Sequence, residues 1–134
     1  LGRAPRDDKD FAEFLEILRK RKIETIILSR GDIFTVSGVK VEVLFPEADE
    51  NALAVSDNNN SLVLRLTFGA KSFLLTGDIE METENRLAQA PEFLKADVAK
   101  VAHHGSRTSS IESFVKATKA RFAVISVGRK SPFG

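Results

Sequence analysis

The stretch that decides the fold is residues 72–106, SFLLTGDIEMETENRLAQAPEFLKADVAKVAHHGS. Residues 72–76 form an apolar strand candidate, and a helix candidate runs from about residue 80 to 89, where Pro91 stops it. A second strand candidate covers residues 96–102. This order of strand, helix and strand predicts two parallel strands joined by a right-handed crossover.

The same alternation continues on both sides of this unit. Downstream, a capping-box pattern at residues 109–112 opens a helix candidate that reaches about residue 118, and the apolar run 121–127 predicts a fully buried strand. Upstream, apolar residues alternate over 62–66 and predict a strand that forms a hairpin with 72–76. We therefore expect an α/β fold.

The first third of the chain predicts further elements. Apolar residues at helical spacing mark one helix face: Phe11, Phe14, Leu15 and Leu18. Asp7 and Asp8 are candidate caps for this helix, and the basic residues 19–22 end it. Residues 23–28 are a β-branched strand candidate, residues 39–43 form an alternating strand that Pro46 ends, and residues 47–60 read as a polar loop.

Composition excludes several classes of protein. The 134 residues are 43% apolar and 29% charged, which suits one folded domain or part of one. No apolar run approaches the roughly 20 residues of a membrane-spanning helix, and the net charge of +1 gives no global basic field for nucleic acid. Without cysteine there are no disulfides and no thiol nucleophile. Because the chain begins with Leu1, we expect it to be a piece of something longer.

Three residues with metal-binding chemistry follow the two parallel strand candidates. Asp78 comes just after the first strand, and His103 and His104, the chain's two histidines, come just after the second. Neighbouring strands lie about 4.8 Å apart, which suits two ligands that share one metal ion at about 2.0–2.2 Å each. Since open α/β sheets bind ligands at this edge, the sequence predicts a metal or catalytic site there.

Plainer interpretations of these residues stay open. An Asp after a strand commonly caps a helix, and a His pair before Gly-Ser commonly forms a turn. The loop 105–110 opens a helix and suits a phosphate, with Arg107 as an added contact, but Ser109 would also cap that helix in the ordinary way. We expect Asp78 either to cap the following helix or to pair with His103 or His104.

Four segments together carry a resemblance to a known family. They read DNNNSLVLRL at 57–66, FLLTGDIE at 73–80, ADV through HHGS at 96–106, and ISVG at 125–128. The series resembles the metallo-β-lactamase-like domain of ComEC-type competence proteins, which take up DNA in bacteria, and it runs from about residue 30 to 133. The resemblance implies an α/β fold of the four-layer αββα type. Residues 1–134 then form only the later part of that domain.

The resemblance also implies roles for individual residues. Asp78 would bridge two metal ions, and His103 or His104 would be the last ligand, with His103 favoured because it lies nearer the strand end. The family's upstream His-Asp metal motif is absent from this chain. Where a further His is usual, the chain has Asn58–Asn60, so Asn59 or Asn60 would orient substrate or a ligand, with Ser106 and Arg107 as further candidate substrate contacts.

The function implied is that of a metal-dependent hydrolase domain of a competence protein. The complete domain would bind two divalent ions, Zn²⁺ or Mn²⁺, and cleave phosphodiesters of the DNA strand that is not imported. Its partners would be single-stranded DNA and the rest of a membrane-embedded channel, as a soluble domain of a bacterial inner-membrane protein on a side that stays open. The chain alone is expected to bind metal weakly or not at all and to be inactive.

Two other functions stay open at this point. One is hydrolysis of a small ester, lactone or phosphoester on the same fold. The other is a non-catalytic module that binds DNA or positions the channel.

Overall fold

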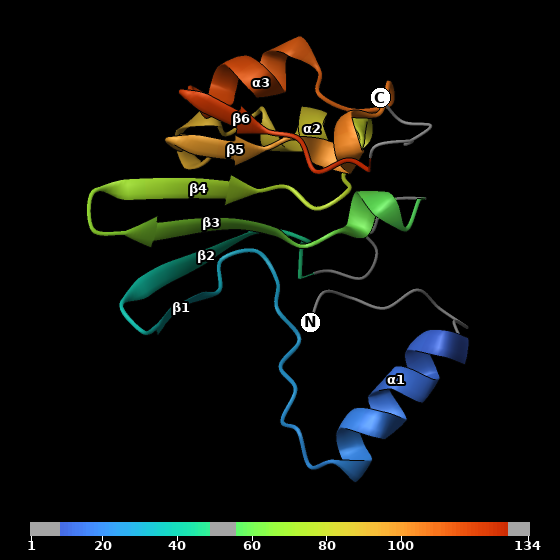
Figure 1. Cartoon of the computed structure of the whole chain (residues 1–134). Coiled ribbons are helices and arrows are strands. Elements are labelled where there is room, and N and C mark those ends of the chain that lie inside the picture. Colours follow the sequence, from blue (N-terminus) through green and yellow to red (C-terminus); the bar gives the residue numbers. More distant parts are fainter. Residues whose placement is uncertain (1–8, 49–55, 129–134) are drawn as a thin grey trace.

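The computed structural model describes residues 9–48 and 56–128 of the chain (Figure 1). The helices are α1 (Lys9–Lys20), α2 (Met81–Leu87) and α3 (Glu112–Thr118), with short 3₁₀ helices η2 (Asn58–Asn60), η3 (Pro91–Phe93) and η4 (Ala102–Gly105). The strands are β1 (Ile33–Val36), β2 (Val39–Phe45), β3 (Val63–Phe68), β4 (Lys71–Leu75), β5 (Val98–Lys100) and β6 (Phe122–Val124). Within these residues, no helix has the length and apolar character needed to cross a membrane. The predicted caps Asp7 and Asp8 lie outside the described residues.

The strands form one six-stranded sheet in the order β1-β2-β3-β4-β5-β6. Strands β1 to β4 pair antiparallel, whereas β5 pairs parallel to both β4 and β6 (Figure 1). The hairpin and the parallel strands with helical crossovers predicted from the sequence are therefore confirmed. Helix α1 is also where its apolar spacing predicts it, but it stands away from the sheet (Figure 1).

Side chains fasten both ends of the β4–β5 pair. At the end where the two strands begin, the Asp97 carboxylate accepts hydrogen bonds from the backbone N–H of Ser72 at 2.9 Å and from its hydroxyl at 3.0 Å. These bonds are the largest cause that lowers the pKa of Asp97 below its ordinary value. At the other end, the buried Thr76 hydroxyl donates to the carbonyl of Lys100 at 2.9 Å. The register of the two parallel strands is thus fixed by side chains as well as by the strand ladder.

The core lies on one face of the sheet, beneath α2 and α3. Leu74 of β4 pairs with Ala99 of β5, and both pack in a cluster with Leu87 of α2 and Phe114 of α3. Apolar residues of α2 and α3 face the sheet, and this burial is what holds two helices of only seven residues each in place.

The opposite face carries an apolar row that crosses the whole sheet. Cross-strand partners in register form this row: Phe34, Val41, Leu66, Phe73, Val98 and Phe122. Phe34, Phe73 and Phe122 remain 37%, 38% and 62% exposed, because no layer of the described residues covers them. Val41 in the same row is buried, so the exposed apolar surface lies over the other strands; exposed apolar surface is unfavourable in water and is typical of interaction surfaces. We call it the open face.

Two sequence predictions about strands are wrong. Residues 23–28 form no strand, and Ile26 and Ile27 are 66% and 68% exposed, since the described sheet ends at β1 and offers this segment no neighbouring strand. The segment 121–127 is not fully buried. Only Phe122–Val124 form a strand, which is the edge of the sheet and is exposed.

Gly77 is the glycine that the turn after β4 requires. Its φ is +58°, and a Cβ placed on it would lie 2.6 Å from the Cβ of Ser61. Gly69, in the β3–β4 turn, has nearly the same φ of +56° but open space around it. A comparison of alanine substitutions at the two positions therefore distinguishes the cost of the backbone conformation from the cost of the steric contact.

We predict that Gly69→Ala lowers the free energy of unfolding by about 1–2 kcal/mol, the cost of a left-handed residue with a side chain. Gly77→Ala adds the contact with Ser61 and should lower it by about 3 kcal/mol or more. Urea denaturation of both variants measures the difference. Equal losses would contradict the close approach of Ser61 to Gly77.

Candidate functional site

The parallel pairing of β4 with β5 brings the two predicted motifs together at one edge of the sheet. The backbone N–H of His103 donates to the carbonyl of Gly77 at 3.3 Å, so the turn after β5 lies directly against the turn after β4. The juxtaposition predicted from strand order is present.

Asp78 uses its two carboxylate oxygens in different directions. Oδ2 lies 3.6 Å from Nε2 of His104, and Oδ1 lies 3.4 Å from the ammonium of Lys100. Its backbone N–H donates to the Ser61 hydroxyl at 3.1 Å. Helix α2 is preceded by Glu80 as its N-cap residue, so the contacts of Asp78 match the expected pairing with a histidine and not a helix cap.

His104 is held so that Nε2 faces Asp78. Its Nδ1 lies 2.6 Å from the carbonyl oxygen of Ser126, which can only accept a hydrogen bond. Nδ1 therefore carries a hydrogen, and in the neutral ring Nε2 is left as an acceptor and metal-binding atom. A backbone carbonyl on the far ring nitrogen is the usual way in which proteins orient a histidine toward a metal ion.

His103 has a different environment. Its side chain is 16% exposed against 39% for His104. Its Nδ1 lies 3.3 Å from the Glu80 carboxylate and 3.3 Å from the Thr108 hydroxyl. Sequence order favours His103 as the partner of Asp78, whereas the side-chain contacts favour His104.

Both histidines lie in a strained turn. The φ and ψ angles are 45° and 46° at His103 and 54° and 23° at His104, and Gly105 follows with φ +81°. Two successive left-handed residues with side chains cost about 1–2 kcal/mol each. Such strain persists only where surrounding contacts fix it, and it concentrates at functional sites.

Lys100 is a site residue that the sequence reasoning missed. Its ammonium donates a hydrogen bond to the carbonyl of Gly77 at 2.8 Å and lies 3.4 Å from Oδ1 of Asp78. It therefore places a positive charge beside the Asp78 carboxylate. One sequence signal was present, because a lysine interrupts a largely apolar stretch three residues before His103.

Glu84 binds the end of the loop that follows the histidines. It is fully buried on α2, and its carboxylate accepts the N–H groups of Ser110 at 2.7 Å and Ile111 at 2.9 Å. Burial raises the pKa of Glu84, and these two backbone hydrogen bonds partly oppose the shift. The predicted cap Ser109 instead donates to the carbonyls of Ala102 and Ser106. An internal carboxylate thus occupies the N–H groups that the sequence analysis considered for a phosphate.

The predicted substrate contacts lie around this site with different exposure. The buried amide of Asn59 accepts from the N–H groups of Glu80 at 2.8 Å and Thr83 at 3.4 Å, so it fastens the start of α2. Asn60 donates to the carbonyl of Ser56. Ser106 is half-buried and contacts Thr108, and Arg107 is exposed. Their roles in substrate binding stay predictions, and Arg107 is the most accessible of the four.

The donor set fits part of a metal site. Asp78 offers a carboxylate, and His104 offers an imidazole nitrogen whose tautomer is already fixed, which are both ordinary ligands of Zn²⁺. Among residues 9–48 and 56–128, however, no group of three or more His, Cys, Asp or Glu side chains is placed to hold a metal ion. Asp78 and His104 are therefore two candidate ligands, and a complete site would need further donors.

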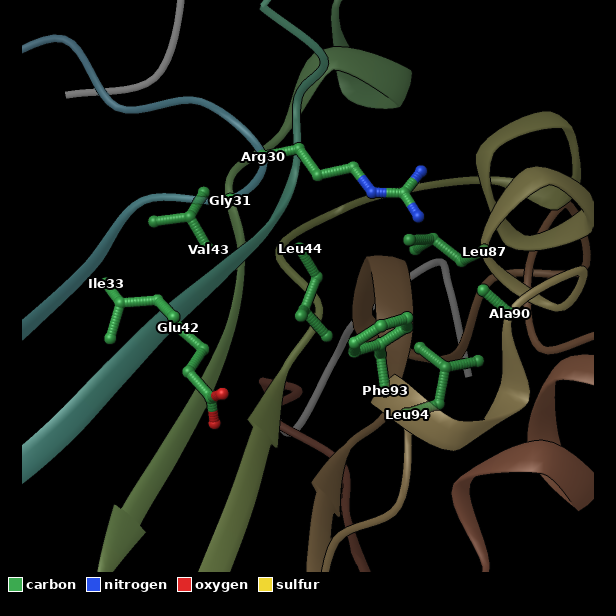
Figure 2. A pocket seen from close by; sticks show the side chains of 10 residues that line it. All are labelled: Arg30, Gly31, Ile33, Glu42, Val43, Leu44, Leu87, Ala90, Phe93 and Leu94. Carbon is green, nitrogen blue, oxygen red and sulfur yellow. The ribbon is translucent and has the colours of Figure 1, made fainter.

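A pocket elsewhere in the molecule is separate from these residues. It has a volume of about 170 Å³, lies between β2 and the α2–η3 segment, and is mostly apolar (Figure 2). Arg30 extends over it (Figure 2) and is paired with Glu47 at 2.7 Å. Neither Asp78 nor the histidines line it.

Several curated proteins with similar sequences have names from bacterial competence and recombination. The chain is 36% identical over 129 residues, 96% of its length, to ComE operon protein 3 of Bacillus subtilis. It is 36% identical over 96 residues (72% of its length) to Recombination protein 2 of Haemophilus influenzae, and 37% identical over 92 residues (68%) to Competence protein ComA of Neisseria gonorrhoeae. The chain spans 16%, 12% and 13% of the lengths of these curated relatives. No protein-family profile matches it.

The burial of Glu84 predicts a pH dependence of stability. Because its pKa is raised above 4.5 in the folded state, its contribution is fully present below pH 4.5 and is lost as pH rises through the raised value. Glu84→Gln carries no charge at any pH. We therefore predict that the free energy of unfolding of the wild type, relative to this variant, falls as pH rises from 4 to 7.

Glu82→Gln, on the exposed side of the same helix, is the matched control, since Glu82 pairs only with Arg86 among the contacts described. Urea denaturation at each pH measures both variants. A difference between wild type and Glu84→Gln that stays constant with pH would contradict the burial of this carboxylate.

Proposed function

We propose that the chain is part of a metal-dependent phosphodiesterase domain of a bacterial DNA-uptake protein. The observation that carries the proposal is the pairing of Asp78 with Nε2 of His104 in a strained turn at the edge of the sheet. The similarity to competence proteins over most of the chain supports the biological setting. Because the chain spans at most 16% of these relatives, the rest of the site and of the protein lies in residues beyond it in this proposal.

Asp78 and His104 are the proposed metal ligands. Bound at such a site, one or two divalent ions, Zn²⁺ or Mn²⁺, lower the pKa of a coordinated water and stabilise charge on a phosphodiester. Lys100 holds Oδ1 of Asp78, and the Ser126 carbonyl holds the His104 ring, so both ligands are oriented before metal binds. Exposed Arg107, on the loop beside the histidines, is the proposed contact for a DNA phosphate.

The open face supports the proposal that this sheet is one half of a metallo-β-lactamase-like αββα sandwich. Its apolar row crosses all six strands, which suits face-to-face packing against a second sheet at about 10 Å. Residues that complete the metal site would come with that second sheet. The chain is then the later part of the domain, as the resemblance implies.

A non-catalytic module is the second candidate. The observation in its favour is that the described residues bring no three metal-binding side chains together. In this case the longer protein binds DNA or positions a channel without cleaving phosphodiesters. The metal content of the longer protein distinguishes these two functions. A comparison of its activity on single-stranded DNA with its activity on small esters distinguishes DNA cleavage from other hydrolysis.

We predict that Asp78→Ala and His104→Ala, made in the longer protein, each lower Mn²⁺- or Zn²⁺-dependent hydrolysis of single-stranded DNA by several orders of magnitude. Each removes a ligand that the reaction needs. Folding should change little, because both side chains are 39% exposed and such exposed ion pairs contribute about 1 kcal/mol or less. Nuclease assays and melting curves measure the two effects.

Glu82→Ala is the control for loss of a surface carboxylate and should retain full activity. A folded Asp78→Ala protein with near-wild-type nuclease activity would eliminate the proposed mechanism. Full activity in His104→Ala together with loss in His103→Ala would instead identify His103 as the ligand.

A further inference from the structure

We propose that Glu80 and His103 form a positioning pair that fixes the left-handed turn and thereby directs the His104 ring toward Asp78. The metal-binding role of His104 rests on the proposed function. The contact between Glu80 and His103 does not depend on it. Glu80 is not one of the predicted metal ligands. His103 was a candidate ligand, but in this proposal it supports the turn and does not bind metal.

Glu80 joins three separate segments through one carboxylate. Its Oε1 accepts from the Thr108 hydroxyl at 2.8 Å and lies 3.3 Å from Nδ1 of His103. Its Oε2 lies 3.3 Å from the Ser56 hydroxyl and 3.5 Å from the amide nitrogen of Asn59. The side chain is only 22% exposed, so these partners replace much of the water that a carboxylate requires. A carboxylate in this position strongly favours an N–H on the facing imidazole nitrogen.

The turn needs such a support because its backbone is strained. Its two successive histidines both have left-handed backbone angles, which are unfavourable for residues with side chains. Glu80 holds the beginning of the turn through His103, and it holds the following segment through Thr108. Glu84 holds the end of the same segment through the N–H groups of Ser110 and Ile111. Two carboxylates, one on the N-cap residue of α2 and one within α2, thus hold the loop that follows His104.

The two histidines then have distinct tasks. The less exposed His103 faces Glu80, and the more exposed His104 faces Asp78 and Ser126. Because His103 and His104 are adjacent in the same left-handed turn, a contact that holds His103 in place also restrains the backbone from which the His104 side chain leaves. His103 and Glu80 are therefore positioning residues, which act through His104.

The test uses nuclear magnetic resonance of the imidazole nitrogens in the chain itself, which has two histidines and so gives a simple spectrum. At about pH 8.5, where an ordinary imidazole is neutral, long-range ¹H–¹⁵N spectra report which nitrogen of each ring carries the hydrogen. In the wild type we expect the Nδ1–H form at both residues. In Glu80→Ala, and in Glu80→Met, which has a similar length but no acceptor oxygen, His103 should lose its single Nδ1–H form. His104 should retain its own, because the Ser126 carbonyl still holds it.

Glu82→Gln is the matched control and should leave both rings as in the wild type. An Nε2–H form at His103 in the wild type, or an unchanged His103 in both Glu80 variants, would overturn the positioning pair. A role for Glu80 in stability alone lowers the melting temperature without changing the His103 tautomer, and this outcome would also overturn it.

The second measurement is Mn²⁺ affinity in the longer protein, where we expect Glu80→Met to weaken binding about tenfold or more. Unchanged affinity would overturn the claim that the pair directs His104. If the wild-type longer protein binds no Mn²⁺ while the tautomer result holds, the proposed function fails and the positioning pair stands.

Discussion

The parallel pairing of β4 with β5 is the constraint on which the rest of the structure depends. Asp97 and Ser72 fasten the strands where they begin, and Thr76 and the Lys100 carbonyl fasten them where they end. With this register, the residues after both strands must emerge side by side. A slip of one residue would turn every side chain of β5 to the opposite face and separate Asp78 from His104.

The site combines strain with support from outside the turn. The turn of His103 and His104 is unfavourable by itself, and its contacts come from Glu80 at the start of α2, from Gly77 after β4 and from Ser126 after β6. The charge of Asp78 is also balanced from outside its own turn, since the ammonium of Lys100 on β5 lies beside its carboxylate. Such an arrangement orients ligands before a metal ion arrives, so little reorganisation opposes binding.

Local pattern predicted most of the strands and helices that pack within the chain, although it missed β1 (Ile33–Val36), and it predicted the edge at which Asp78 and the histidines meet. It failed at residues 23–28 and 121–127, because an apolar pattern shows which residues require burial but not whether the burying layer belongs to the same chain. The carboxylates of Glu80 and Glu84 could not be assigned either. Their partners lie more than twenty residues away and meet them only in the folded protein. Lys100 is the exception, since a cation within an apolar strand is visible in the sequence.

The most direct test of the central claim is anomalous diffraction at the Mn edge from crystals of the longer protein soaked with Mn²⁺. The account predicts an anomalous peak within coordination distance, about 2.2 Å, of both the Asp78 carboxylate and Nε2 of His104. His103 should remain against Glu80 in the same crystals. A peak bound to His103, or occupied manganese sites with none at Asp78, would contradict the account.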